Sequence, residues 1–410
     1  MDVIVLGLML LSLTIWLGLL CFWGQFWRTD QQLEIGETQL ESLPVVCAVV
    51  PARNEAELIP TSLRSLLLQD YPGSFNVFLV DDRSTDGTAS FAEGVAHAVG
   101  KPQQLHIISG ELLPSGWSGK LWAVEQGIKS ASKFAPDYFL LTDADIEHDP
   151  GNLRRLVAKA VQEDLDMVSV MVRLRCDSFW EKLLIPAFVF FFQKLYPFRW
   201  VNNPNNPTAG AAGGSILIAR EALERIGGIQ VIRQALIDDC ALAQAVKKSG
   251  GQGDKETRGI NNDLYPIPTQ GRIWLGLSSL TRSLRPYDSL ATIWDMVARS
   301  AYTQLNYSPL LLLGTLVGMP LIYLVLPVCV ILGAVWGSWA IALTGLLGWL
   351  LMSLAYYPTI RFYKCSPWLA FSLPAIAFLY TLMTLDSALR HWQGRGGAWK
   401  GRVYPSSDNL

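Results

Sequence analysis

The chain has 410 residues, of which 50% are hydrophobic and only 17% are charged, so it is too apolar for one soluble domain. Its formal net charge of −2 gives no reason to expect nucleic acid as a partner. The six cysteines and four histidines are scattered along the chain, which argues against a disulfide framework and against a zinc site.

The N-terminal stretch predicts a membrane helix. Residues 3–27 are apolar apart from small polar residues and one glutamine, and Arg28 follows them. A helix of that length spans roughly 30 Å of hydrocarbon. A cleaved signal peptide is the alternative, but no basic stretch precedes the apolar residues and the run is too long. We expect residues 1–28 to form a transmembrane anchor, with Asp2 outside and Arg28 on the cytoplasmic side.

The middle of the chain, residues 44–285, predicts an α/β domain. Short runs of β-prone residues alternate with segments of helical periodicity, beginning with a buried parallel strand. This alternation favours a doubly wound sheet, in which ligands bind at the carboxyl ends of the strands. We expect strands at 45–50, 76–80, 105–108 and 138–142, and helices at 55–69, 88–99 and 121–131.

Carboxylates follow two of these strands. Asp81 and Asp82 come directly after the second strand, and Asp143 and Asp145 follow the last one. Residues two apart on an extended chain point to the same side, so the latter two can face one ligand together. Converging carboxylates repel each other unless a cation lies between them, and Mg²⁺ or Mn²⁺ bound partly through substrate phosphates meets that need. Asp149, which precedes a proline, is expected to cap a helix instead.

Two loops are candidates for contact with a nucleotide. One follows the first strand, where a capping box of Asn54 with Glu57 is the structural alternative. The other is the glycine-flanked loop 116–120, which lacks the P-loop pattern but places Lys120 within reach of a diphosphate. The stretch 84–88 is interpreted as a turn and a helix start. The residues predicted to contact the nucleotide or its phosphates are Pro51, Ala52, Arg53, Asn54, Glu55, Asp81, Asp82, Lys120 and Asp143.

Two later segments are candidates for the acceptor side. Residues 209–215 are all small, so either another molecule approaches the backbone there or the chain makes a tightly packed turn. We expect Gly213, Gly214 and Ser215 to face the acceptor. Asp238 and Asp239 open a helical run, where a carboxylate is either a cap or a general base for an acceptor hydroxyl. We assign the role of base to Asp239.

The last third of the chain is amphipathic and then apolar. Residues 286–307 predict an interfacial segment, whose Arg299 either completes a diphosphate clamp or pairs with lipid headgroups. A membrane bundle is expected at 308–390, with spans near 308–332, 338–359 and 367–389, and a basic tail at 391–410. Three full spans would not leave both the middle domain and the tail in the cytoplasm, so one segment is expected to be re-entrant or interfacial. The apolar run at 183–198 fits an interfacial or acceptor-lining helix as well as a core helix.

Together these segments resemble family 2 glycosyltransferases of the GT-A fold, over residues 45 to about 307. The resemblance implies that the loop 51–55 and Asp82 contact the nucleotide. It implies that Asp143 and Asp145 hold the metal and the diphosphate. It also implies that Asp239, the second residue of an acidic pair, is the base of an inverting transfer.

One motif of the membrane-bound branch of this family is altered. That branch often ends with Gln-x-x-Arg-Trp, whereas residues 296–300 are Met-Val-Ala-Arg-Ser and keep only Arg299. Polysaccharide synthases use the tryptophan to hold the acceptor end, so the departure weakens an interpretation as a polysaccharide synthase.

More narrowly, the chain resembles the hopene-associated glycosyltransferases in segments 116–123, 196–202, 235–242 and 282–287. This implies an enzyme of the bacterial inner membrane, with its catalytic domain in the cytoplasm and a nucleotide-sugar donor. The implied acceptor is a lipid hydroxyl, of a hopanoid or a related isoprenoid or sphingoid lipid. The alternatives are a polyprenyl-phosphate sugar transferase, which needs no base, and a catalytically inactive membrane scaffold.

Overall fold

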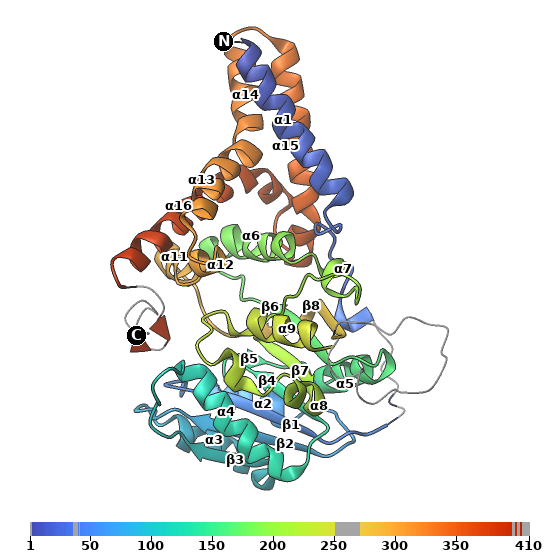
Figure 1. Ribbon diagram of the computed structural model, residues 1–410, viewed down its shortest axis with the longest axis vertical. Coiled ribbons are helices and arrows are strands. Elements are labelled where there is room, and N and C mark those ends of the chain that lie inside the picture. Colours follow the sequence, from blue (N-terminus) through green and yellow to red (C-terminus); the bar gives the residue numbers. More distant parts are fainter. Residues whose placement is uncertain are drawn as a thin grey trace.

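An eight-stranded mixed sheet forms the centre of the middle domain in the computed structural model, which describes residues 2–35, 40, 42–250, 271–395, 398–399 and 402–403. Figure 1 shows this domain at one end of an elongated molecule and a column of helices at the other, with the N-terminus at the far tip. The predicted α/β class with apolar helices at both ends is confirmed.

The strands follow the order β3-β2-β1-β4-β7-β6-β8-β5. The first four in this order are parallel, β7 runs antiparallel to both β4 and β6, and β5 runs antiparallel to β8. Their bounds are β1 Val46–Ala52, β2 Phe75–Asp81, β3 Leu105–Ser109, β4 Tyr138–Thr142, β5 Ile146–Glu147, β6 Met167–Arg173, β7 Ser215–Ala219 and β8 Ile273–Ser283.

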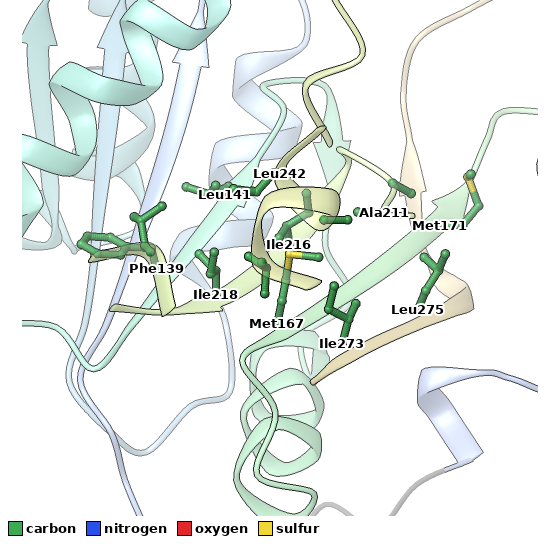
Figure 2. Close-up of a cluster of buried hydrophobic side chains, with 14 of the residues drawn as sticks. Phe139, Leu141, Met167, Met171, Ala211, Ile216, Ile218, Leu242, Ile273 and Leu275 are labelled. Atoms are coloured by element: carbon green, nitrogen blue, oxygen red, sulfur yellow. The ribbon is translucent and has the colours of Figure 1, made fainter. Parts of the chain in front are cut away.

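The two faces of the sheet carry separate cores because side chains alternate along each strand. On β1, Cys47 and Val49 belong to one core, whereas Val46, Ala48 and Val50 belong to the other. Figure 2 shows part of the first core, where Leu141 of β4 lies beside Leu242 of a covering helix and Ile216 of β7 and Leu275 of β8 belong to the same cluster. The helices of this domain are α2 Ile59–Leu67, α3 Thr88–Ala98, α4 Gly119–Ala131, α5 Asn152–Gln162, α6 Phe179–Leu195, α7 Phe198–Val201, α8 Arg220–Arg225 and α9 Asp238–Ser249.

Two predicted helix starts are wrong. The helix expected from residue 55 begins at Ile59, and its N-cap Leu58 makes no side-chain hydrogen bond, so the capping box of Asn54 with Glu57 does not form. The helix expected after Asp149 begins at Asn152. Gln69, more than eighty residues earlier, accepts a hydrogen bond from the Leu153 N–H in its first turn. The Asp149 side chain accepts from the Gly151 N–H, so this carboxylate is structural, as expected.

The apolar helices pack together above the sheet domain. Three of them are long and apolar enough to cross a membrane, in the described part of the chain, and α13 with α14 forms a further candidate that is bent by 48°. α1 ends five residues before Trp27, the end of the predicted apolar run. The elements are α1 Asp2–Phe22, α11 Leu290–Ala298, α12 Ala301–Gln304, α13 Pro309–Tyr323, α14 Val325–Val335, α15 Trp339–Phe362 and α16 Leu373–Trp392. Short elements are the 3₁₀ turns η1 Leu33–Ile35, η2 Pro102–Gln104, η3 Ser132–Phe134, η4 Ile229–Ile232 and η5 Pro367–Ser372, and the hairpin of β9 Ala398–Trp399 with β10 Arg402–Val403.

The helix α6 joins the two halves of the molecule. Ile185 and Val189 pack into the core of the sheet domain, whereas Leu184, Ala187 and Phe190 pack among the apolar helices. In Figure 1, α6 lies across the molecule between the sheet and the helical column. Burial on both sides agrees with the core-helix alternative for this segment.

Candidate active site

Seven of the predicted site residues line a cleft of about 510 Å³ at the carboxyl ends of β1 and β4. Two of its walls come from the sheet domain, and a third comes from α11, which packs against the apolar helix α16. The cleft therefore extends from the sheet toward the apolar helices. It is lined by Pro51, Glu55, Ser118, Lys120, Asp143, Ala144, Asp145, Ala235, Leu236, Asp238, Arg285, Tyr287, Thr292, Asp295, Met296 and Arg299.

Lys120 bridges two carboxylates from different elements. It lies in the first turn of α4, where the Ser118 hydroxyl caps the helix by accepting from the Leu121 N–H. Its Nζ atom is 2.8 Å from Oδ1 of Asp143, after β4, and 3.0 Å from Oδ2 of Asp238, at the start of α9. Burial alone would lower the pKa of Lys120, but the two carboxylates outweigh it and raise the pKa above its ordinary value. The lysine is therefore a fixed positive charge between the two acidic motifs.

Arg285 holds the second carboxylate of the Asp-x-Asp pair. Its Nε is 3.0 Å from Oδ2 of Asp145, and a second guanidinium nitrogen is 2.5 Å from Oε1 of Glu55. Both carboxylates are largely buried, and their attraction raises the pKa of Arg285 although burial opposes the charge. Arg285 was not predicted at the site. Its only signal was that it lies in the segment 282–287, one of those that resemble the hopene-associated glycosyltransferases.

The donor set at Asp143 and Asp145 fits a divalent metal. Lys120 contacts one oxygen of Asp143 and Arg285 contacts one oxygen of Asp145, so each carboxylate keeps a second oxygen for a ligand. No group of three or more acidic, histidine or cysteine side chains surrounds a possible ion position among the residues that the structure describes. Two carboxylates completed by water and substrate phosphates are the coordination that Mg²⁺ commonly has in proteins.

Asp239 follows Asp238 but does not line the large cleft. Its Oδ2 accepts a hydrogen bond from the Gly213 N–H at 2.8 Å, and its Oδ1 accepts from the Cys240 N–H at 2.7 Å. Asp239 lines a small pocket that shares Lys120, Asp143 and Asp238 with the large cleft. Burial and the neighbouring Asp238 raise the pKa of Asp239 to about 7, although Lys120 and the backbone donors oppose them. A carboxylate with this pKa can exchange a proton near neutral pH.

The predicted acceptor-side glycines behave differently from each other. Gly213 lies at the site, within contact of Asp239 and Lys120. Gly214 is packed so closely that an added Cβ would lie 2.9 Å from Val172, and Ser215 is fully buried at the start of β7. For Gly214 and Ser215 the structure therefore matches the tightly packed turn that was the alternative.

The residues of the loop 51–55, after β1, also differ in whether they face the cleft. Pro51 and Glu55 line the large cleft, whereas Ala52 is fully buried. Arg53 donates to the Asp82 carbonyl at 2.6 Å and lies 3.5 Å from its carboxylate, so these two predicted donor residues form a unit.

Two further predicted donor residues shape turns beside this unit. Asp81 accepts from the Ser84 N–H, and Asn54 accepts from the Thr85 N–H. The Asp86 side chain accepts from the N–H and the hydroxyl of Thr88, which agrees with a turn and helix start at 84–88.

Arg299 lines the cleft from the C-terminal end of α11. On the same helix, Asp295 also faces the cleft and is 2.7 Å from the Arg390 guanidinium of α16. Trp294 donates from its indole nitrogen to Asp386 of α16 at 2.7 Å. These contacts fix α11 between the cleft and the apolar helices, so the structure brings Arg299 to the site at its end near those helices.

Part of the domain that carries the cleft is similar to known proteins. Residues 47–227 match the family model described as Glycosyl transferase family 2. Over 151 residues the chain is 32% identical to undecaprenyl-phosphate 4-deoxy-4-formamido-L-arabinose transferase of Enterobacter sp. (strain 638), which covers 35% of this chain and 42% of that protein. The enzyme of the same name from Sodalis glossinidius is 30% identical over 139 residues, covering 33% of this chain and 40% of that protein. The chain thus spans less than half the length of these relatives.

Among solved structures, the mannosyltransferase PcManGT from Pyrobaculum calidifontis in complex with GDP-Man and Mn²⁺ resembles the chain over most of its length. The two share 18% sequence identity with a TM-score of 0.48, over 95% of this chain and 96% of that one. A glucosyl-3-phosphoglycerate synthase from M. tuberculosis shares 19% identity with a TM-score of 0.38, over 64% of this chain and 80% of that one. Membership of the hopene-associated subgroup stays a prediction.

Proposed function

We propose that the chain moves a sugar from a nucleotide-sugar donor to a membrane lipid, because residues 47–227 match the model of glycosyl transferase family 2. One observation carries the proposal. A single cleft is lined by the Asp-x-Asp carboxylates and Lys120 on one side and by α11, which packs on the apolar helices, on the other. A donor diphosphate and the head of a lipid can therefore meet in the same place.

The donor lies at the end of the cleft near β1. Pro51, Arg53, Glu55 and Asp82 contact the nucleotide, and Lys120 balances the charge of its diphosphate. Asp143 and Asp145 hold Mg²⁺ or Mn²⁺. When bound, this ion supplies Lewis-acid stabilisation of the departing diphosphate.

The acceptor is proposed to be a lipid hydroxyl, with Asp239 as the base. The Asp239 carboxylate takes the hydroxyl proton while the oxygen attacks the anomeric carbon from the side opposite the diphosphate, which inverts that carbon. A pKa of about 7 suits this role, because the base is deprotonated and still able to accept a proton near neutral pH. Asp238 lies beside it and is paired with Lys120. A hopanoid or a related isoprenoid or sphingoid lipid remains the proposed acceptor class.

A polyprenyl phosphate is the second candidate acceptor, and the names of two relatives favour it. Its phosphate is already an anionic nucleophile and needs no base. Arg299 lines the end of the cleft near the apolar helices, where it would pair with such a phosphate.

The membrane placement follows from the outer surface of the helices. Leu10 and Leu17 of α1, Ile331 of α14, and Leu347 and Leu354 of α15 are all exposed although apolar. Exposed apolar side chains on several long apolar helices are expected where a protein faces lipid. We place the helices in the bacterial inner membrane and the middle domain on its cytoplasmic face.

Product chemistry tests the acceptor. The purified chain is incubated with Mn²⁺, a radiolabelled nucleotide sugar and membrane lipid extract, and the labelled lipid is then treated with mild acid. A glycoside of a lipid hydroxyl survives that treatment, whereas a sugar on a polyprenyl phosphate is released. A product that survives and that requires Asp239 supports the first acceptor. An acid-labile product made equally well by Asp239→Asn selects the second.

A further inference from the structure

The two carboxylates of the Asp-x-Asp pair are held by different cations. Asp145 contacts Arg285, which also contacts Glu55, whereas Asp143 contacts Lys120, which also contacts Asp238. Arg285 is therefore fixed between two acidic groups on the donor side. Lys120 instead joins the metal-binding aspartate to the acidic pair at the start of α9.

The two cations also differ in how they can move. A guanidinium binds carboxylates through several nitrogens in a fixed plane, so Arg285 cannot leave one partner without disturbing the other. An ammonium is a compact charge on a flexible stem. Lys120 can therefore exchange one anionic partner for another by rotating its side chain.

A divalent ion and Lys120 compete for the charge of the same carboxylate, because an ion on the second oxygen of Asp143 would lie close to the ammonium that contacts the first. Two positive groups near one carboxylate repel each other strongly in a site that is partly shielded from water. The Asp143 side chain is only 35% exposed and that of Lys120 only 21% exposed, so solvent screens this repulsion incompletely. A bound diphosphate changes the balance, because its oxygens offer Lys120 a negatively charged partner outside the carboxylates.

We propose that Lys120 makes metal binding conditional on the donor, which rests on the function proposed above. Without a diphosphate, Lys120 holds Asp143 and Asp238 together and keeps a free divalent ion out. When the donor diphosphate enters, Lys120 turns to it, which releases Asp143 for the metal and Asp238 from its ion pair. After transfer and departure of the nucleoside diphosphate, Lys120 returns to the two carboxylates. The lysine is thus a positioning residue that couples the donor site to the acidic pair beside the base.

The test measures Mn²⁺ binding rather than activity. The full chain in detergent is titrated with Mn²⁺ alone, and with Mn²⁺ in saturating UDP or GDP, while free Mn²⁺ is followed by electron paramagnetic resonance. The wild type is expected to bind Mn²⁺ weakly alone and more tightly with a nucleotide. Lys120→Met is expected to bind Mn²⁺ alone about tenfold more tightly, and to lose a similar factor from the nucleotide-dependent gain.

Three variants separate this coupling from a general effect of charge. Lys120→Arg keeps the cation, so it should exclude Mn²⁺ alone as the wild type does. Its guanidinium should leave the two carboxylates less readily, so the nucleotide-dependent gain in Mn²⁺ affinity should be smaller than in the wild type. Arg299→Met removes the same charge from the same cleft but not from Asp143, so its affinity for Mn²⁺ alone should change by less than about threefold. Lys129→Met alters an exposed lysine near the other end of α4 and should change nothing.

Two results would overturn the coupling through Lys120. The proposed function would still stand in both cases if the wild type shows nucleotide-dependent Mn²⁺ binding. One is a Lys120→Met variant that binds Mn²⁺ alone no more tightly than the wild type. The other is an Arg299→Met variant that tightens Mn²⁺ binding as much as Lys120→Met. If wild-type protein binds no Mn²⁺ with either nucleotide, the assignment of Asp143 and Asp145 as metal ligands fails, and the coupling through Lys120 fails with it.

Discussion

Asp239 is the residue on which the proposed acceptor chemistry depends. Its carboxylate is oriented by two backbone N–H groups, so it is held in position before any substrate arrives. Burial and Asp238 raise its pKa well above that of an ordinary aspartate, to about 7, so the protonated form persists to a higher pH. A base must be deprotonated to act, so activity should be present above this pKa and lost below it.

Measured against pH, kcat/KM should therefore rise through about pH 7 and then level off. Asp239→Asn should lower kcat by about 10²- to 10⁴-fold and abolish this dependence, because asparagine cannot accept the proton. Unchanged nucleotide-dependent Mn²⁺ binding in the variant would show that the site is intact. Nearly full activity in Asp239→Asn would rule out the hydroxyl acceptor and favour the phosphate.

Arg285 is expected to matter for stability as well as for binding. Arg285→Met removes the cation that faces Glu55 and Asp145, whose side chains are only 7% and 13% exposed. The free energy of unfolding should fall by about 2 kcal/mol, since two largely buried carboxylates lose their shared partner. Thermal unfolding in detergent measures the loss. Adding Glu55→Gln should restore part of it, and a double variant less stable than the single one would contradict this account.

The site residues that follow strands were predictable, whereas Arg285 was not. Asp143, Asp145 and Glu55 follow β4 and β1, and the carboxyl ends of parallel strands meet at one edge of a sheet. Arg285 is far from these residues in the sequence. It lies next to Asp145 because β8 pairs with β5, with Ser283 opposite Ile146. That antiparallel pairing follows from tertiary packing, and the sequence near Arg285 carries no local signal of it.

At the scale of elements, the interiors of strands and helices were easier to predict than their ends. The strand β4 spans residues 138–142 as expected, because its five residues are β-prone and directly followed by the acidic motif. The start of α5 was misplaced because Gln69, from a different element, satisfies an N–H of its first turn. A cap supplied across the fold leaves no pattern next to the helix that it caps.

The bend between α13 and α14 has a specific partner on α1. Pro327 has no N–H to donate to the carbonyl four residues before it, which weakens the helix near the break at Leu324. The Trp16 indole nitrogen of α1 donates to the Ile322 carbonyl at 2.8 Å. The N-terminal helix therefore satisfies a polar backbone group of the bend among apolar helices.

Trp16→Phe should lower the free energy of unfolding by about 0.6 kcal/mol beyond its loss of packing, as is typical of a hydrogen bond between membrane helices. Trp23→Phe is the matched control, because Trp23 donates to the exposed carbonyl of Lys194. Denaturant unfolding in mixed micelles compares the two variants. Equal losses in both would argue that the contact to Ile322 has no role in holding the bend.

At the scale of the whole molecule, the helices divide into two groups. In Figure 1, α1, α14 and α15 run side by side to the tip that carries the N-terminus, whereas α13 and α16 slope away toward the sheet domain. The C-terminal half of α16 is tied to α11 through Asp386 and Arg390. From the sequence alone, three C-terminal spans would not leave both the middle domain and the basic tail in the cytoplasm. Length and apolarity do not distinguish a crossing helix from one that lies at the membrane surface.

We expect three crossings, by α1, by the bent pair and by α15, with α16 at the cytoplasmic surface. A reporter tag at either the C-terminus or the middle domain should then be accessible only from the cytoplasm. Tags before Asp2 and at Gly337, between α14 and α15, should be accessible only from the outside. A C-terminal tag on the same side as the N-terminal one would show that α16 crosses the membrane.

Release of a nucleoside diphosphate tests the central claim most directly. The purified chain in detergent is incubated with Mn²⁺ and a panel of nucleotide sugars, with and without membrane lipid extract, and the released nucleoside diphosphate is measured. The account predicts release from one donor that lipid stimulates and that Asp145→Ala abolishes. No release from any donor, together with no nucleotide binding, would contradict it and indicate a catalytically inactive membrane scaffold.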